Sequence, residues 1–380
     1  MQRPPIFQEE HELLRETVRR FIREEVAPYH AQWEREGMVA RELWRRAGEI
    51  GLLCPSVPSE YGGLGADFRY NTVIGEELAR AFATGPLFGF MAHSDIAVSY
   101  VLHYGTEEQK RRILPGMISG EIVCAIAMTE PATGSDLASI GTHAVADAGD
   151  YVLNGSKMFI SNGQSADVMV VVARVLPQVD AKSLSLFLVE CSRPGFSRGR
   201  NLEKLGLKAQ DTSEIFFSNL RIPKSNLIGR EHEAFGYLMA QLPQERLSIA
   251  IAAMGACEGA YAETLAYVRE RKAFGRHICE FQNTRFTLAG LKTEIAAGRA
   301  FLDHCLSLHL KADLDASGAA MCKLFTTELQ GRVVDACLQL FGGYGYMLEY
   351  PIARAYADAR VQRIYGGTSE IMKELISRSL

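Results

Sequence analysis

The sequence predicts an α+β protein in which a helical segment, a strand-rich segment and a second helical segment follow one another. Three observations support this prediction. Apolar residues recur at helical spacing up to about residue 118, the period falls to two or to short apolar runs from about 121 to 222, and helical spacing returns from about 233. We therefore expect three domains, at residues 1–120, 121–232 and 233–380.

The first segment carries apolar residues three and four positions apart. Leu14, Val18 and Phe21 form such a row, and Pro28 stops it. These patterns predict an N-terminal α-helical domain. Four further helical patterns follow, at 39–51, 69–83, 88–104 and 106–118.

The middle segment is predicted to be a β domain. Asn154-Gly155 is the strongest short signal for a hairpin, and it separates two strand-like stretches. Short strands without helices between them favour a small barrel or sandwich over a doubly wound parallel sheet. The other strand-like stretches are 122–128, 168–175, 184–189 and 214–217.

The last segment is rich in Ala, Leu, Glu and Arg at helical spacing. Long helices with short connections pack as an antiparallel bundle, so a helical bundle is expected here. The helical patterns cover 246–272, 283–310, 316–341 and 351–362.

Composition narrows the function classes. A net charge of −4 over 380 residues argues against a nucleic-acid surface. The eight cysteines lack the spacing of redox or zinc motifs, which predicts reduced thiols. No signal or transit pattern is evident and no apolar stretch is long enough to cross a bilayer, so we expect a cytoplasmic protein without membrane insertion.

Several common site motifs are absent from the sequence. It contains neither a Walker-type phosphate loop nor a His-Glu-x-x-His zinc helix. The glycine clusters at 62–65 and 342–345 do not stand between a strand and a helix of a βαβ unit. His304 and His309 are five residues apart and share a helix face poorly, so no metal site is expected.

Two segments in the β region suit a flat cofactor, although each also has a plain structural explanation. The stretch 128–136 is dense in small and hydroxyl residues, which let a ligand approach the backbone, and it would also make an ordinary loop. The stretch 158–163 places an aromatic ring beside a hydroxyl, and it would also be a buried strand ending in a turn.

Three segments in the helical region are equally ambiguous. Arg271 to Gly275 would bind an anion or simply end a helix, with Gly275 as its cap. Glu245, near the expected start of that helix, would be a catalytic acid or base or a solvated first-turn carboxylate. The run 366–370 forms a glycine loop followed by a helix N-cap, with N–H groups free to hold a carbonyl or a phosphate.

The order and spacing of these segments resemble the acyl-CoA dehydrogenase family over nearly the whole chain. The long-chain subgroup is the most similar, because it shares Leu-Pro-Gln-Glu-Arg at 242–246 and Ile-Tyr-Gly-Gly-Thr at 364–368. The series consists of Thr-Glu-Pro-x-x-Gly-Ser-Asp from Thr129, Asn-Gly-x-Lys-x-Phe-Ile-Ser-Asn-Gly from Asn154, Arg-Lys-x-Phe-Gly from Arg271, Gln-x-x-Gly-Gly-x-Gly from Gln339 and Tyr-x-Gly-Thr-Ser from Tyr365.

The resemblance implies a fold and an activity. The fold is an N-terminal α-helical domain, a central β-barrel and a C-terminal four-helix bundle, assembled into a homotetramer. The activity is the FAD-dependent α,β-desaturation of a fatty or branched acyl-CoA thioester, in which a base removes the α-proton and a hydride passes from the β-carbon to flavin N5. Electron-transfer flavoprotein is the implied electron acceptor.

The resemblance also implies two sets of site residues. Within the cofactor set, Arg271, Gln282 and 339–343 are expected to reach the FAD of a neighbouring subunit. The substrate set is Ser135, Pro243, Arg246, Gly366 and Gly367. The cofactor set is Ile126, Ala127, Met128, Thr129, Gly134, Ser135, Phe159, Ile160, Ser161, Arg271, Phe274, Gln282, Gln339, Leu340, Phe341, Gly342, Gly343, Thr368, Ser369 and Glu370.

The resemblance assigns the catalytic base to Glu245. Short- and medium-chain members carry a glutamate directly after the loop tyrosine, where this chain has Gly366. Long-chain and isovaleryl members place it on a helix immediately before an arginine, which is the position of Glu245. We expect a dry pocket to raise the pKa of Glu245 towards neutrality. Arg246 need not neutralise it, because adjacent helix residues do not face each other.

Several alternatives stay open on the same fold. The acyl group could be carried by an acyl-carrier protein, or the enzyme could be an acyl-CoA oxidase. A non-catalytic flavin-binding scaffold is disfavoured because Glu245, Arg246 and Ser135 are retained together. Phe88 would either shorten the acyl cavity or fill the core, and Gly236 replaces a tyrosine of the long-chain members. The natural acyl chain, the acceptor and the pathway are therefore not predicted.

Overall fold

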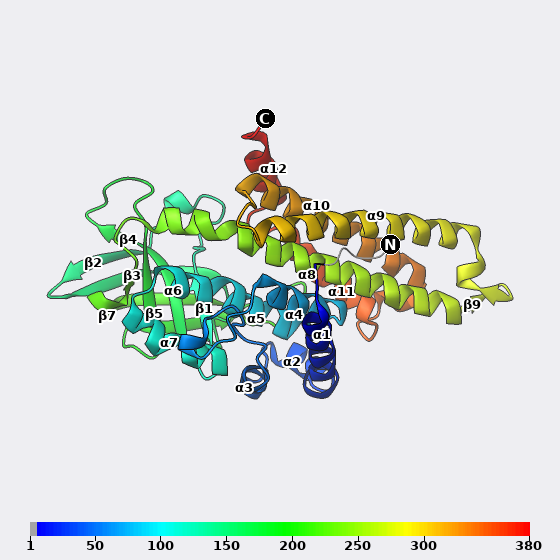
Figure 1. The fold of residues 1–380 in the computed structure, drawn as a ribbon, viewed down its shortest axis with the longest axis horizontal. Helices are drawn as coiled ribbons and strands as arrows, with labels where there is room; N and C mark the ends of the chain where they lie inside the picture. Colours follow the sequence, from blue (N-terminus) through cyan, green and yellow to red (C-terminus); the bar gives the residue numbers. More distant parts are fainter. Residues whose placement is uncertain (1–5) are drawn as a thin grey trace.

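The computed structural model describes residues 6–380 and contains helices, then a sheet, then helices again (Figure 1). This order confirms the predicted α+β class. Seven helices precede the sheet in the described part of the chain. They are α1 (Glu9–Phe21), α2 (His30–Glu36), α3 (Arg41–Glu49), α4 (Phe68–Arg80), α5 (Thr84–Phe90), α6 (Val98–Tyr104) and α7 (Glu107–Ser119).

Local signals explain where several of these helices begin and end. Thr106 caps α7 by accepting from Gln109 N, and the Gln109 side chain returns a bond to Thr106 N. Gly120 ends the same helix at φ +76°. Helices α5 and α6 are joined by π-helical turns at Met91–Ala97, so the predicted helix at 88–104 is one continuous but irregular element.

The middle region is an open mixed sheet. Its strand order is β6-β7-β3-β2-β4-β5-β8, and β1 runs parallel to the first half of β4. Strands β6 and β8 are the two ends, and no pairing among the described residues joins them, so the expected barrel is not closed by hydrogen bonds. The strands are β1 (Cys124–Ala127), β2 (His143–Asp147), β3 (Asp150–Ser161), β4 (Val168–Leu176), β5 (Ser185–Glu190), β6 (Phe196–Asn201), β7 (Thr212–Pro223) and β8 (Leu227–Ile228).

The predicted hairpin at Asn154-Gly155 is wrong. Both residues lie inside β3, where the register against β7 shifts between Leu153 and Gly155. Gly155 is needed at this bulge because its φ is +143° and a Cβ there would come within 2.5 Å of Thr142 Oγ1. The hairpin turn is instead at Ala148-Gly149, between β2 and β3.

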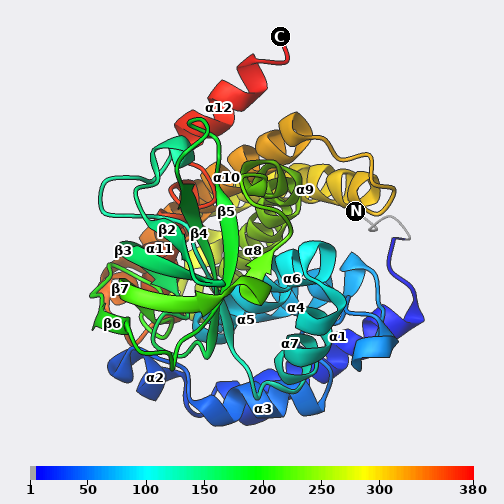
Figure 2. The same ribbon diagram turned by 90° about the vertical axis from the view of Figure 1, so that its left-hand side faces the viewer.

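The C-terminal region is built on three long helices that lie side by side, with the shorter α11 packed against α10 and α8 (Figure 1). Helix α12 projects away from the rest of the chain in both views (Figure 2). The elements are α8 (Ala234–Glu270), β9 (Lys272–Ala273), β10 (Arg276–His277), α9 (Gln282–His309), α10 (Ala316–Phe341), α11 (Pro351–Ala359) and α12 (Ser369–Ser377).

Helix α8 connects all three regions. Leu238 packs with the sheet and α7, Ile249 with the N-terminal helices, and Leu247 with the bundle. A helix that is apolar on every side is buried, and here it passes through the centre of the molecule. The predicted start at 246 is wrong: the helix begins at Ala234, and Pro243 lies inside it.

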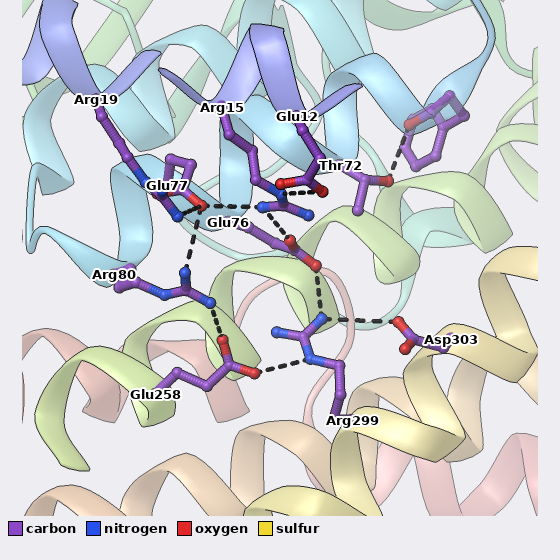
Figure 3. A network of polar contacts seen from close by, with 11 residues as sticks. Glu12, Arg15, Arg19, Thr72, Glu76, Glu77, Arg80, Glu258, Arg299 and Asp303 are labelled. Atoms are coloured by element: carbon purple, nitrogen blue, oxygen red, sulfur yellow. Dashed lines mark hydrogen bonds and ion pairs between the residues drawn. The ribbon is translucent and has the colours of Figure 1, made fainter. Parts of the chain in front are cut away.

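A network of buried ion pairs joins the N-terminal helices to the bundle (Figure 3). Glu76 on α4 contacts Arg15 of α1 at 2.9 Å and also contacts Arg299 of α9. The neighbouring Glu77 accepts hydrogen bonds from Arg15 and Arg19 at 2.9 and 2.7 Å. Such pairs fix the geometry between elements, because breaking one leaves buried charges with fewer partners. None of the helices in the described range is long and apolar enough to cross a membrane.

Candidate active site

Glu245 is a buried carboxyl in the interior of α8. Glu245 is only 6% exposed. Tyr100 on α6 donates a hydrogen bond from its hydroxyl to Glu245 Oε1 at 2.7 Å. Burial raises the pKa of Glu245 to about 7, while the Tyr100 hydroxyl and the Arg246 charge hold it down. Because α8 begins at Ala234, Glu245 is not a solvated first-turn residue.

Tyr100 was not predicted from the sequence as part of this site. It is 145 residues away from Glu245 along the chain, and no local pattern marks it. Its contact exists because α6 crosses α8 at the level of Glu245. Burial and the nearby Glu245 raise the pKa of the Tyr100 phenol, so it stays protonated and donates.

The loop Gly366–Gly367 lies against α8 beside Glu245. A Cβ at Gly366 would come within 2.4 Å of Ile249 Cδ1, and Ile249 follows Glu245 by one helical turn. Both glycines have positive φ, at +63° and +95°. Lys323 Nζ donates to Gly367 O at 2.6 Å, and Thr368 caps α12 by accepting from Ile371 N. The predicted loop and N-cap are therefore confirmed.

Arg246 is buried next to Glu245 in the chain. Among the residues that the structure describes, its Nε has no hydrogen-bond partner. Burial lowers the pKa of Arg246, and Glu245 opposes that shift. A buried guanidinium nitrogen without a protein partner suits an oxygen atom supplied by a bound molecule.

The two segments of the β region that were predicted to line a cofactor lie side by side. Met158 N donates to Thr129 O at 2.9 Å, and the buried Lys157 donates to Met128 O at 2.9 Å. Phe159 is 62% exposed at φ +60°, a conformation that bulky residues rarely adopt. Strain of this kind persists where a side chain must be presented in one direction.

Three family models match the chain in order. The N-terminal, middle and C-terminal domain models of acyl-CoA dehydrogenase match residues 8–121, 125–220 and 234–380. The chain belongs to the acyl-CoA dehydrogenase family. Membership makes it an oxidoreductase that uses FAD and acts on acyl-CoA thioesters.

Individual acyl-CoA dehydrogenases are similar over the full length. The mitochondrial long-chain specific acyl-CoA dehydrogenase of Rattus norvegicus is 51% identical, with 99% of this chain and 87% of the relative aligned. The acyl-CoA dehydrogenase structure from Geobacillus kaustophilus has a TM-score of 0.96 at 47% identity and covers 99% of both chains. An FAD complex from Bacillus anthracis has a TM-score of 0.93 at 30% identity, covering 100% of this chain and 68% of that one.

The residues predicted to hold the FAD of an acyl-CoA dehydrogenase fit such a group. Phe159 is an exposed aromatic wall next to the hydroxyl residues Thr129 and Ser161. A Cβ at Gly134 would meet nothing within 4 Å, so the loop after β1 leaves room there. Ser135, on the same loop, is exposed. Flat apolar surface beside small and hydroxyl residues matches an isoalloxazine ring and its polar edge.

A second group of predicted FAD residues lies at the opposite end of α8. Arg271 directly follows α8, and its guanidinium stacks over the Tyr344 ring at 5.3 Å, which brings it to the run 339–343. Phe274 is 95% exposed in the β9–β10 turn (Figure 1). Gly275 is in that turn and does not cap α8, which ends at Glu270. Gln282 begins α9 nearby.

The remaining predicted positions lie at the start of α12, on α5 and near the start of α8. Ser369 donates to Glu328 Oε1 at 2.7 Å, and Glu370 is exposed. Phe88 is buried in the N-terminal core and packs edge-on against Tyr365, with ring centroids 6.1 Å apart. A Cβ at Gly236 would meet nothing within 4 Å, so the missing tyrosine leaves open space.

Proposed function

We propose that the protein desaturates a fatty or branched acyl-CoA between its α and β carbons, with Glu245 as the base that removes the α-proton. The burial of Glu245 carries this proposal. A carboxyl whose pKa is about 7 is partly ionised at neutral pH and still strong enough to accept a proton. Gly366 stands directly after Tyr365, so no carboxylate follows the loop tyrosine.

The side chains around Glu245 have distinct roles in this proposal. Tyr100 binds Oε1, which leaves Oε2 to face the α-carbon. The backbone N–H of Gly366 donates to the thioester oxygen in this proposal, where negative charge develops as the proton leaves. Arg246 contacts the substrate through its guanidinium, whose Nε has no hydrogen-bond partner among the described residues. Bound FAD supplies the acceptor for the two electrons that leave the substrate.

The residues proposed for FAD binding form two separate groups, which supports a shared cofactor site. Glu245 and Arg271 are 26 positions apart along one nearly continuous helix, a distance of about 40 Å. One chain therefore does not bring Glu245 and Arg271 to the same flavin. We propose that a neighbouring subunit supplies the second group, in a homotetramer with a middle domain that closes as a barrel-like wall around FAD.

Exposed aromatic and apolar side chains near β9–β10 support this arrangement. Phe274, Tyr346 and Leu348 are 95%, 83% and 69% exposed. Large apolar residues gathered at one end of a chain mark a contact surface.

The proposed domains remain 1–120, 121–232 and 233–380, supported by the ends of α7 and β8 and the start of α8. The eight cysteines form no disulfide, which supports a reducing compartment such as the cytoplasm. Cell fractionation tests this proposed location.

Anaerobic titration tests the proposed activity. The purified yellow protein is mixed with butyryl-, octanoyl- and palmitoyl-CoA, and the flavin absorbance is followed. Bleaching by at least one thioester is expected, and its rate reports the chain preference. The absence of bleaching with every thioester would contradict the proposal.

Two further arms test the partner and the acceptor. The same acyl groups on acyl-carrier protein are expected to react more slowly than on CoA. We also propose electron-transfer flavoprotein as the acceptor, so air should release little peroxide. Rapid peroxide formation would identify an oxidase instead.

A further inference from the structure

Lys323 on α10 is an unusual buried charge. Its residue is 0% exposed, and its Nζ donates to the carbonyl of Gly367 at 2.6 Å. Within residues 6–380, no carboxylate oxygen lies within 4 Å of this Nζ. The other fully buried lysine, Lys157, does have such a partner, because Glu130 Oε1 lies 2.8 Å from its Nζ.

Packing alone does not explain a lysine at this position. An ammonium removed from water without a carboxylate is costly, and a methionine would fill the same space without that cost. Burial lowers the pKa of Lys323 to about 8, helped by the charge of Arg246 and opposed by Glu328 and Glu370. The side chain is therefore still mostly protonated at neutral pH.

The position of the ammonium relates it to the proposed chemistry. Lys323 holds Gly367, and the adjoining Gly366 touches Ile249 one turn after Glu245. The partly unpaired guanidinium of Arg246 is on the same stretch of α8. Lys323 and Arg246 are thus two buried positive charges near enough to affect each other, and Lys323 is bonded to the loop that we propose binds the thioester oxygen.

We propose that Lys323 is a positioning residue for α-proton removal, which holds the Gly366–Gly367 loop against α8 and adds positive charge beside the thioester oxygen. This inference rests on the proposed function. In that step the α C–H bond breaks, the proton passes to Glu245, and the electron pair of the bond shifts onto the thioester oxygen. Fixed positive charge and a fixed N–H donor at that oxygen stabilise the charge that develops.

The test uses Lys323→Met and Lys323→Gln in the FAD-loaded oligomer. Methionine removes the charge and the donor, and glutamine keeps an amide donor without the charge. With octanoyl-CoA, we expect Lys323→Met to lower kcat and the rate of α-proton exchange in D2O by about 10- to 100-fold, less than the loss of a direct oxyanion donor. KM and FAD content should change by less than about threefold. Lys323→Gln should keep the Gly366–Gly367 loop in place but should not restore the rate of α-proton exchange.

Lys204→Met is the matched control. Lys204 also donates to a main-chain carbonyl, that of Gln210, but it lies in the middle domain. We expect this variant to lose some thermal stability and to exchange α-protons at the wild-type rate.

Two results would overturn the role of Lys323. One is α-proton exchange by Lys323→Met within about twofold of the wild type. The other is full recovery by Lys323→Gln, which would leave the charge without a role. Either result, combined with an inactive Glu245→Gln, would refute only this inference. Unimpaired exchange by Glu245→Gln would instead refute the proposed function.

Discussion

At the scale of single residues, opposing effects set the pKa of Glu245. Burial raises its pKa to about 7, and the Tyr100 hydroxyl and Arg246 lower it. The sequence could indicate the carboxylate, because its place before Arg246 matches a position used by part of the family. It could not indicate Tyr100, because the pairing arises only when α6 and α8 pack together.

Tyr100→Phe is expected to move the acid limb of the kcat/KM profile to higher pH. The base acts only when ionised, and the lost hydrogen bond stabilised the ionised form, so the apparent pKa of Glu245 should rise. A hydrogen bond to a charged group is worth roughly 1.5–3 kcal/mol, which corresponds to a shift of about one pH unit or more.

Tyr104→Phe serves as the control for that profile. Tyr104 is on the same helix and accepts from Gln241 rather than contacting Glu245. Its variant should leave the acid limb in place. An unchanged or lowered apparent pKa in Tyr100→Phe would show that the hydroxyl does not tune the base.

At the scale of elements, the periodicity of apolar residues predicted the long helices and the order of the regions well. Single residues that usually mark a turn or a helix end predicted boundaries poorly. The long helices and the order of the regions followed from the pattern. The pattern places the start of α8 at 246, but packing on all sides keeps the helix continuous from Ala234 through Pro243. Asn154-Gly155 gave a false hairpin, because the glycine serves a bulge inside β3. Closure of the sheet depends on long-range pairing that no local pattern reports.

The ion network between α1, α4 and α9 gives a prediction about stability (Figure 3). Glu76→Gln should leave Arg15 and Arg299 short of a buried carboxylate partner. Breaking a buried pair in this way costs about 3–5 kcal/mol. Urea unfolding of the FAD-loaded protein, at one fixed protein concentration, measures the change.

Glu294→Gln is the comparison variant for this network. Glu294 pairs with Arg332 at 2.9 Å, and both side chains are about half exposed. An exposed pair contributes at most about 1 kcal/mol, so this variant should unfold almost like the wild type. Equal effects of the two substitutions would contradict the importance of the buried network.

At the scale of the whole molecule, the residues proposed for FAD binding fall into two groups at opposite ends of α8. The distance between the two groups cannot be read from the sequence. The resemblance assigned some of them to a neighbouring subunit. The structure is consistent with that assignment, because β3, which contains Phe159, and Arg271 lie at opposite ends of α8 (Figure 1). Because we propose that each chain holds only part of the FAD site, we expect cofactor binding to be coupled to assembly.

Removal of FAD should therefore weaken the oligomer. Arg271→Ala should weaken FAD binding, although Arg271 is about 40 Å from Glu245. Loss of a charge-assisted contact to the cofactor predicts a roughly tenfold or larger rise in Kd. Flavin fluorescence titration measures the affinity, and analytical ultracentrifugation measures the assembly.

Arg269→Ala is the control for the cofactor experiment. Arg269 is exposed on the last turn of α8 and is not among the predicted FAD residues. It should bind FAD normally. A monomer that binds FAD with full affinity, or an Arg271→Ala variant with unchanged Kd, would contradict a shared site.

The central claim is that Glu245 removes the α-proton, and exchange of that proton tests it most directly. Glu245→Gln is loaded with FAD and incubated with octanoyl-CoA in D2O, and deuterium at the α-carbon is measured. We expect the variant to keep its FAD and to lose exchange and turnover by at least about 100-fold. Exchange at the wild-type rate would show that Glu245 is not the base, and Glu370 would then be the first carboxylate to examine.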